Sequence, residues 1–243
     1  MSAGALTEGR TCPAAGRLRR RLGVAAALTF LPLGAAGVAF VAIRPDHTAP
    51  NFPGVSIAKS AAYRDQALLE RAWQLPAASQ FGRRVAYQKN PTSCGASSLA
   101  NVERSFGLES SEASILAGTG KCWFGYCLGG LTLDELASVA LASTQREVTV
   151  KRDISFETFR EELRRSNDLE RRVVINFHRG SLFGQGMGHF SPIGGFLEKE
   201  DLVLVLDVNA KFGPFLVDAR RLYDAMNTTD AMAGKRRGLL VLR

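Results

Sequence analysis

Three residues of this chain have the types and settings of a cysteine acyl-transfer site: Cys94, His189 and Asp207. Cys94 ends the run Gln-Lys-Asn-Pro-Thr-Ser-Cys, His189 lies in Gly-Met-Gly-His-Phe-Ser-Pro, and Asp207 closes Leu-Val-Leu-Val-Leu-Asp. A thiol is a poor nucleophile at neutral pH unless an imidazolium or a helix N-terminus stabilises its thiolate. A cysteine, a histidine and an orienting carboxylate together therefore indicate nucleophilic catalysis.

The residues that follow Cys94 have the apolar spacing of a helix, because Leu99, Val102 and Phe106 recur every three or four positions. Cys94 is thus expected at a helix N-terminus, where the helix dipole favours the thiolate and a backbone N–H can bind an oxyanion. Gln88, upstream of Cys94, can supply the second oxyanion donor.

Apolar runs typical of short strands surround the other two residues, at 172–177, 190–197 and 202–208. Antiparallel pairing across a polar turn at 198–201 would bring His189 beside Asp207. An aspartate there holds one histidine tautomer and favours the imidazolium. A lone cysteine is more often a small buried hydrophobe, so it is the three residues together that favour catalysis.

Several sequence blocks, which follow one another in a fixed order along the chain, make the functional interpretation more specific. They are residues 90–95, 131–136, 188–194, 206–208, 222–230 and 237–238. With them the region from about residue 88 to 243 resembles the phytochelatin synthase family, papain-like enzymes that act on glutathione, and especially its short bacterial members. The resemblance implies an α+β, papain-like cysteine peptidase fold. Its helical half would carry Cys94, and its antiparallel sheet half would carry His189 and Asp207.

The resemblance also implies roles for individual residues. Cys94 would be the nucleophile, His189 the general base and acid, Asp207 the orienting carboxylate and Gln88 the oxyanion donor. Two further residues match a family pair in the substrate pocket: Arg237 and Asp230. Glutathione carries carboxylates and an α-ammonium group, which need charged partners, and arginine can bind a carboxylate through two hydrogen bonds.

The implied reaction is thiol-dependent transfer of γ-glutamylcysteine from glutathione. Attack of Cys94 on the Cys-Gly carbonyl would expel glycine and leave a thioester, which water or a second glutathione resolves. The chain ends at Arg243 without the Cys-rich extension of plant-type members and has four cysteines, so we expect mainly hydrolysis, with phytochelatin synthesis as a second outcome. No cofactor and no metal site are expected. Cd²⁺ or Zn²⁺ would act as part of a metal–glutathione thiolate substrate.

Two other classes of function stay open at this point: a cysteine peptidase of different specificity, such as one that cleaves leader peptides, and a noncatalytic thiol protein that binds soft metals. The pair Cys122 and Cys127 leaves three interpretations open, namely a disulfide, a soft-metal pair or two unrelated buried thiols.

The N-terminus has the pattern of a membrane-targeting signal. Five arginines within residues 1–21 precede an uncharged, apolar stretch at 22–43. This stretch is long enough to cross a hydrocarbon core of about 30 Å. We expect a transmembrane anchor, or a signal segment cleaved near Ala39, then a linker at 44–54 and a catalytic domain at 55–243. The positive-inside rule leaves residues 1–21 cytoplasmic and puts the catalytic domain on the periplasmic side of a bacterial inner membrane, or free in the periplasm after cleavage.

The formal net charge of +8 is weak evidence for a nucleic-acid partner. When residues 1–21 are set aside, the net charge falls to +4, and no basic stripe interleaved with aromatic residues is present. We expect glutathione as the partner and no nucleic acid, and the oligomeric state is left open. Further helices are expected at 61–75, 110–116, 132–143, 155–166 and 219–226.

Overall fold

The computed structural model describes residues 55–123, 126–127 and 129–243. Their main element is a six-stranded, fully antiparallel sheet of order β1-β8-β2-β3-β4-β5. Its strands are β1 (Val148–Lys151), β2 (Arg172–His178), β3 (Gly188–Leu197), β4 (Leu202–Leu206), β5 (Pro214–Asp218) and β8 (Leu239–Leu242). A separate two-stranded hairpin consists of β6 (Thr229–Asp230) and β7 (Lys235–Arg236).

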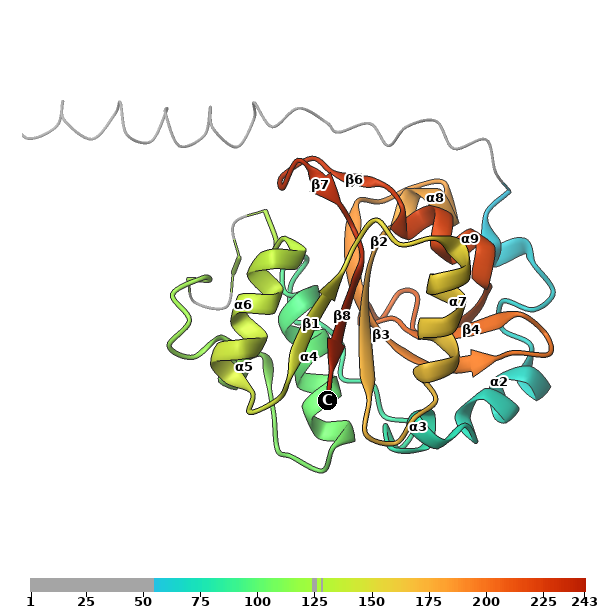
Figure 1. Ribbon diagram of the computed structural model, residues 1–243, viewed down its shortest axis with the longest axis horizontal. Coiled ribbons are helices and arrows are strands. Elements are labelled where there is room, and N and C mark those ends of the chain that lie inside the picture. Colours follow the sequence, from blue (N-terminus) through green and yellow to red (C-terminus); the bar gives the residue numbers. More distant parts are fainter. Residues whose placement is uncertain (1–54, 124–125, 128) are drawn as a thin grey trace, which may run out of the picture. The chain divides into compact units, whose positions relative to one another are not determined.

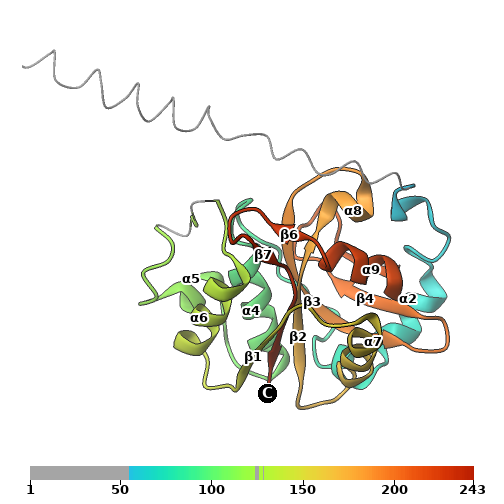
Figure 2. The same cartoon turned by 45° about the horizontal axis from the view of Figure 1, so that its top comes forward.

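Helices cover both faces of the sheet (Figure 1). They are η1 (Ile57–Lys59), α2 (Gln66–Trp73), α3 (Pro76–Ser79), α4 (Cys94–Ser105), α5 (Glu112–Leu116), α6 (Leu133–Ser143), α7 (Phe156–Arg165), α8 (Arg179–Phe183) and α9 (Ala219–Met226). One apolar cluster joins α4, α5 and α6 to one face, and a second joins α7 and α9 to the other. Figure 2 shows the same division from a second direction. The helical half therefore packs directly on the sheet half.

The buried strand β2 shows how the sequence produces this layering. All of its residues are buried, and Val173, Ile175 and Phe177 alternate toward α7 and α9 while Val174 faces α4. Successive side chains of a strand point to opposite faces, so a strand covered on both sides can be apolar without alternation. This explains the run from Val173 to Ile175, although the buried strand also contains Arg172, Asn176 and His178.

The predicted α+β architecture is confirmed, with Cys94 on a helix and His189 on the antiparallel sheet. The expected helix at 61–75 is wrong at its start, because α2 begins at Gln66, where the Asp65 side chain accepts a hydrogen bond from the Leu68 N–H and caps it. Strands β1 and β5 were not anticipated. Both lie at an edge of the sheet and are short; β1 has no fully buried position, and β5 has only three, between Pro214 and the exposed Asp218.

The predictions for residues 1–21, 22–43 and 44–54 concern segments outside the described residues, so the division into anchor, linker and catalytic domain stays a prediction. Among the residues that the structure describes, no helix has the length and apolar character needed to span a membrane.

Candidate active site

Cys94 is the first residue of α4, as the apolar spacing predicted. The residue before it, Ser93, makes no side-chain capping bond to the helix. Gly95 lies close to α6, because a Cβ added there would be 2.9 Å from Leu136 Cδ1. The first-turn N–H groups and the positive end of the helix dipole thus lie at the thiol, where they can stabilise a thiolate and bind an oxyanion.

A tight turn leads into this helix and carries Gln88 next to it. The Asn90 side-chain oxygen accepts from the Thr92 N–H and hydroxyl, at 3.0 and 2.8 Å. Gln88 Nε2 donates to the Asn90 carbonyl at 2.8 Å, and the Gln88 N–H donates to the Val208 carbonyl at 2.7 Å. The amide has two hydrogens on Nε2, so one remains for an oxyanion. The structure therefore ties the Gln88 loop both to the nucleophile turn and to the residue after Asp207.

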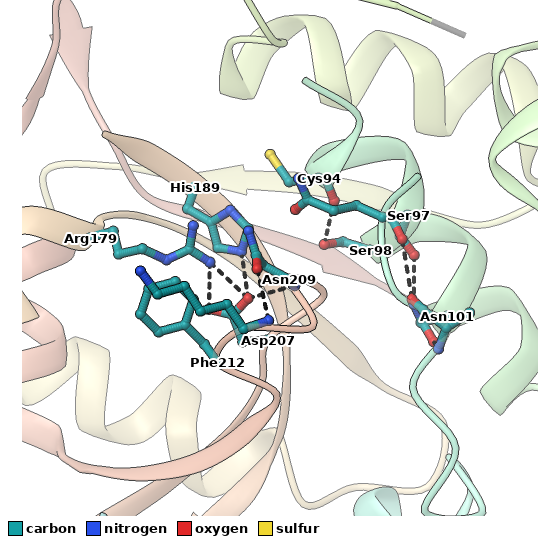
Figure 3. A network of polar contacts seen from close by, with 12 residues as sticks. Cys94, Ser97, Ser98, Asn101, Arg179, His189, Asp207, Asn209 and Phe212 are labelled. Atoms are coloured by element: carbon teal, nitrogen blue, oxygen red, sulfur yellow. Dashed lines mark hydrogen bonds and ion pairs between the residues drawn. The ribbon is translucent and has the colours of Figure 1, made fainter. Parts of the chain in front are cut away.

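His189 and Asp207 meet as the predicted strand pairing requires. His189 lies near the start of β3, and Asp207 directly follows β4, its neighbour in the sheet. His189 Nε2 is 2.9 Å from Asp207 Oδ1, and both side chains are almost completely buried (Figure 3). This bond fixes the ring and leaves Nδ1 for the thiol of Cys94.

Electrostatics favour a thiolate–imidazolium pair. Burial alone would raise the pKa of Cys94, but the hydrogen bond and charge of His189, the Phe190 N–H and the Arg179 charge outweigh it, so the pKa of the thiol is lowered. Burial alone would lower the pKa of His189, but Asp207 and the thiolate outweigh it, so that pKa is raised. Opposite shifts in the two partners are what an activated cysteine requires.

Arg179 is a functional residue that sequence reasoning missed. Its Nη2 donates to both oxygens of Asp207, at 2.8 and 2.7 Å, and its guanidinium lies 4.3 Å from the centre of the Phe212 ring (Figure 3). The Asn209 N–H donates to the same carboxylate at 2.8 Å. The one available signal was a basic residue directly after an apolar strand, which sequence alone does not distinguish from a surface arginine.

We expect Arg179→Gln to lower the rate of the reaction at Cys94 about tenfold. Arg179 lowers the pKa of Cys94, so its loss should move the acid limb of Cys94 alkylation by iodoacetamide to higher pH. Arg179→Lys, which keeps the charge, should restore part of that shift. The control is Arg71→Gln on α2, which removes an exposed ion pair between Arg71 and Glu200. An unchanged pH profile in Arg179→Gln would show that this arginine is not needed to keep the pKa of Cys94 low.

The structure also brings Arg237 to the site. Its guanidinium is buried, with Nη1 donating to Thr228 Oγ1 at 3.1 Å and to the Thr229 carbonyl at 2.6 Å, while Nε has no protein partner. It packs on Gly188, the neighbour of His189, since a Cβ there would be 2.8 Å from Arg237 Nη2. Burial lowers the pKa of Arg237 and the charge of Asp230 partly opposes this shift. The two predicted substrate-pocket residues therefore interact electrostatically, beside the histidine.

His178 lies in the same place, beside the neighbour of the catalytic histidine. It ends β2 opposite Gly188 and is buried. Burial, and then the charge of Arg237, lower its pKa, which favours the neutral imidazole. The sequence pattern around His178 contained no glycine-flanked motif, so only the strand register shows this placement.

Cys122 and Cys127 form a disulfide, which settles the three interpretations left open above. Cys94 is the free cysteine among the described residues. The Cys127 N–H donates to Thr92 Oγ1 at 3.2 Å, so the disulfide loop contacts the turn that precedes the nucleophile. Within the described ranges no cluster of three or more potential metal ligands is found.

Comparisons with known proteins find similar sequences. The family described as phytochelatin synthase matches residues 127–239. Glutathione gamma-glutamylcysteinyltransferase of Schizosaccharomyces pombe is 29% identical over 67% of this chain and 42% of its own length. Glutathione gamma-glutamylcysteinyltransferase 1 of Triticum aestivum is 34% identical over 46% of this chain and 23% of its own length. The chain thus spans less than half the length of these relatives.

The similarity to solved structures is weaker. A putative C39-like peptidase from Bacillus anthracis is 13% identical, with 67% of this chain and 95% of that chain covered and a TM-score of 0.49. The peptidase domain of Streptococcus ComA is 15% identical, with 65% and 96% covered and a TM-score of 0.46. Over residues 127–239 the chain is thus similar to the phytochelatin synthase family, and the curated relatives that it resembles are named glutathione gamma-glutamylcysteinyltransferases.

Proposed function

We propose that this protein transfers the γ-glutamylcysteinyl group of glutathione through a thioester on Cys94. The observation that carries the proposal is the buried His189, whose Nε2 lies 2.9 Å from Asp207 Oδ1 and whose charge lowers the pKa of the Cys94 thiol at the start of α4. Relatives named for this transferase activity support glutathione as the donor. Neither leader-peptide cleavage nor noncatalytic metal binding has comparable support.

The site residues account for each step of the first half-reaction. The Cys94 thiolate attacks the carbonyl carbon of the Cys-Gly peptide bond of glutathione. The negative oxygen that forms is stabilised by backbone N–H groups at the start of α4 and by Gln88 Nε2. His189 then gives its proton to the glycine nitrogen as the C–N bond breaks, and a thioester remains on Cys94.

The second half-reaction uses the same histidine in the opposite sense. Neutral His189 takes a proton from the acceptor as it attacks the thioester, and the Cys94 thiolate leaves. Water as acceptor gives γ-glutamylcysteine. The α-amino group of a second glutathione as acceptor gives a phytochelatin. We expect water to be the main acceptor.

Arg237 and Asp230 are proposed to bind the γ-glutamyl head group of glutathione. The buried Arg237 guanidinium has an unpaired Nε, which suits a carboxylate, and the nearby Asp230 suits the α-ammonium. In this proposal Cd²⁺ or Zn²⁺ enters as a metal–glutathione thiolate substrate, which would connect the enzyme with metal detoxification.

We further propose that the catalytic part lies in the periplasm, attached to the inner membrane through residues 22–43 or released after their cleavage. The Cys122–Cys127 disulfide supports this placement, because structural disulfides persist mainly in oxidising compartments.

Mass spectrometry of the purified full chain incubated with reduced glutathione tests the function. We expect a γ-glutamylcysteinyl adduct on Cys94 and release of one glycine for each acyl group transferred to Cys94. The same samples with and without Cd²⁺ would give the ratio of γ-glutamylcysteine to longer γ-glutamylcysteine oligomers, and hence the preferred acceptor. Absence of both the adduct and glycine would refute the proposed function.

A further inference from the structure

Asp134 joins the helical half of the protein to the β6–β7 hairpin. It lies in the first turn of α6, where Thr132 and Glu135 form a capping box and the helix dipole favours a carboxylate. Its Oδ1 is 2.7 Å from Arg152 Nη1, and its Oδ2 is 2.9 Å from Lys235 Nζ on β7. Each carboxylate oxygen thus has its own cationic partner.

Arg152 strengthens the same link. Its Nε donates to the Arg236 carbonyl at 2.9 Å, and its side chain is only 15% exposed. One guanidinium therefore binds Asp134 on α6 and the backbone of β7 at once. In Figures 1 and 2 the hairpin leans toward the side of the sheet that carries α6.

The hairpin depends on outside contacts. Its strands have two residues each, and an isolated hairpin of this size is not stable in water. It nevertheless carries Asp230 and leads directly into Arg237, whose guanidinium packs on Gly188 beside His189. The position of the hairpin consequently sets where both charged groups lie.

The other side of α6 lies against the start of the nucleophile helix. A Cβ on Gly95 would be 2.9 Å from Leu136 Cδ1 and 3.5 Å from Leu131 Cδ1. The block at 131–136 thus contacts both the Cys94 helix and, through Asp134, the hairpin. This gives a physical role to a sequence block that the catalytic residues leave unexplained.

We propose that Asp134, with Arg152 and Lys235, is a positioning residue that holds the hairpin so that Arg237 and Asp230 face glutathione bound at Cys94. The proposal rests on the proposed function for the identity of the ligand. The link between α6 and the hairpin, called the tether below, rests only on the contacts of Asp134. The Lys235 pair is exposed and contributes little alone, so the more shielded Arg152 contacts carry most of the effect.

The test compares the full chain with Asp134→Asn, which keeps the side-chain size and removes the charge. Hydrogen–deuterium exchange should become faster in residues 229–237 and stay unchanged in α4. The kcat/KM for glutathione should fall about threefold to tenfold, through KM, with kcat within about twofold. The kcat/KM for N-acetylcysteinylglycine, which lacks the γ-glutamyl head group, should not change. Asp134→Glu should keep most of the wild-type behaviour.

Glu200→Gln is the matched control, since it removes the Arg71–Glu200 ion pair far from the hairpin in the fold, and it should alter neither measurement. Unchanged exchange at 229–237 in Asp134→Asn would overturn the tether, whatever the enzyme does. Equal losses for glutathione and for the truncated substrate would overturn the role in head-group binding. Lack of glycine release by the wild type would instead refute the proposed function, and the exchange measurement would still decide the tether.

Discussion

Replacement of Cys94 by serine is expected to reduce glycine release from glutathione by a factor of about 10³ or more. Serine is nearly isosteric, and the position is buried in an apolar cluster with Leu99 and Leu136, so the fold should tolerate the change. The hydroxyl, however, has a much higher pKa than the thiol. The charges of His189 and Arg179 that lower the pKa of Cys94 cannot make serine an anion at neutral pH.

The measurement is the rate of glycine release by Cys94→Ser, together with mass spectrometry for an acyl adduct. Cys12→Ser is the control, because Cys12 is the other cysteine of the chain outside the disulfide, and it should leave the rate unchanged. More than a tenth of the wild-type rate in Cys94→Ser would show that another group is the nucleophile.

Local sequence patterns were sufficient to predict the central geometry. The helix after Cys94 follows from apolar spacing within twelve residues, and the His189–Asp207 contact follows from two neighbouring strands and one turn. Both features depend on residues close together in the chain. For such features periodicity and turn signals are informative.

Features set by distant pairing could not be predicted in this way. Strand β1 pairs with β8, which follows almost ninety residues later, and the short apolar run of β1 does not indicate its partner. Arg179 reaches Asp207 because α8 follows directly on β2, at the end of the strand that pairs with β3. The disulfide loop reaches Thr92 across more than thirty residues. Only the assembled fold brings these groups together.

Arg179, which the sequence patterns did not indicate, explains how a buried site can hold the thiolate–imidazolium pair. Cys94 as thiolate and Asp207 carry two negative charges, and protonated His189 and Arg179 carry two positive ones. Removal of charges from water is costly unless each has close partners of opposite sign. Burial raises the pKa of Asp207, but His189 and Arg179 outweigh it and keep the carboxylate ionised. The four groups thus balance one another inside the protein.

This balance predicts a large effect of His189→Asn, which keeps the size of a polar side chain but cannot carry a proton. Glycine release should fall by a factor of about 10³, since both the proton donor and the imidazolium are lost. Burial of Cys94 would then no longer be opposed by its main partner. The pKa of the thiol should therefore rise, and iodoacetamide should alkylate Cys94 only at alkaline pH.

In the wild type the same pair should give a bell-shaped pH dependence of kcat/KM. As pH falls through the lowered pKa of Cys94, the thiolate is lost, and as pH rises through the raised pKa of His189, the imidazolium is lost. Each limb reports the titration of the coupled Cys94–His189 pair and not of one residue alone. The alkylation profile of His189→Asn should show a single rise, at high pH, where the thiol ionises without the imidazolium. His47→Asn, in the predicted linker, should behave as the wild type does. An alkylation profile unchanged by His189→Asn would mean that the helix N-terminus and Arg179 suffice to hold the thiolate, and that His189 acts only as the proton donor.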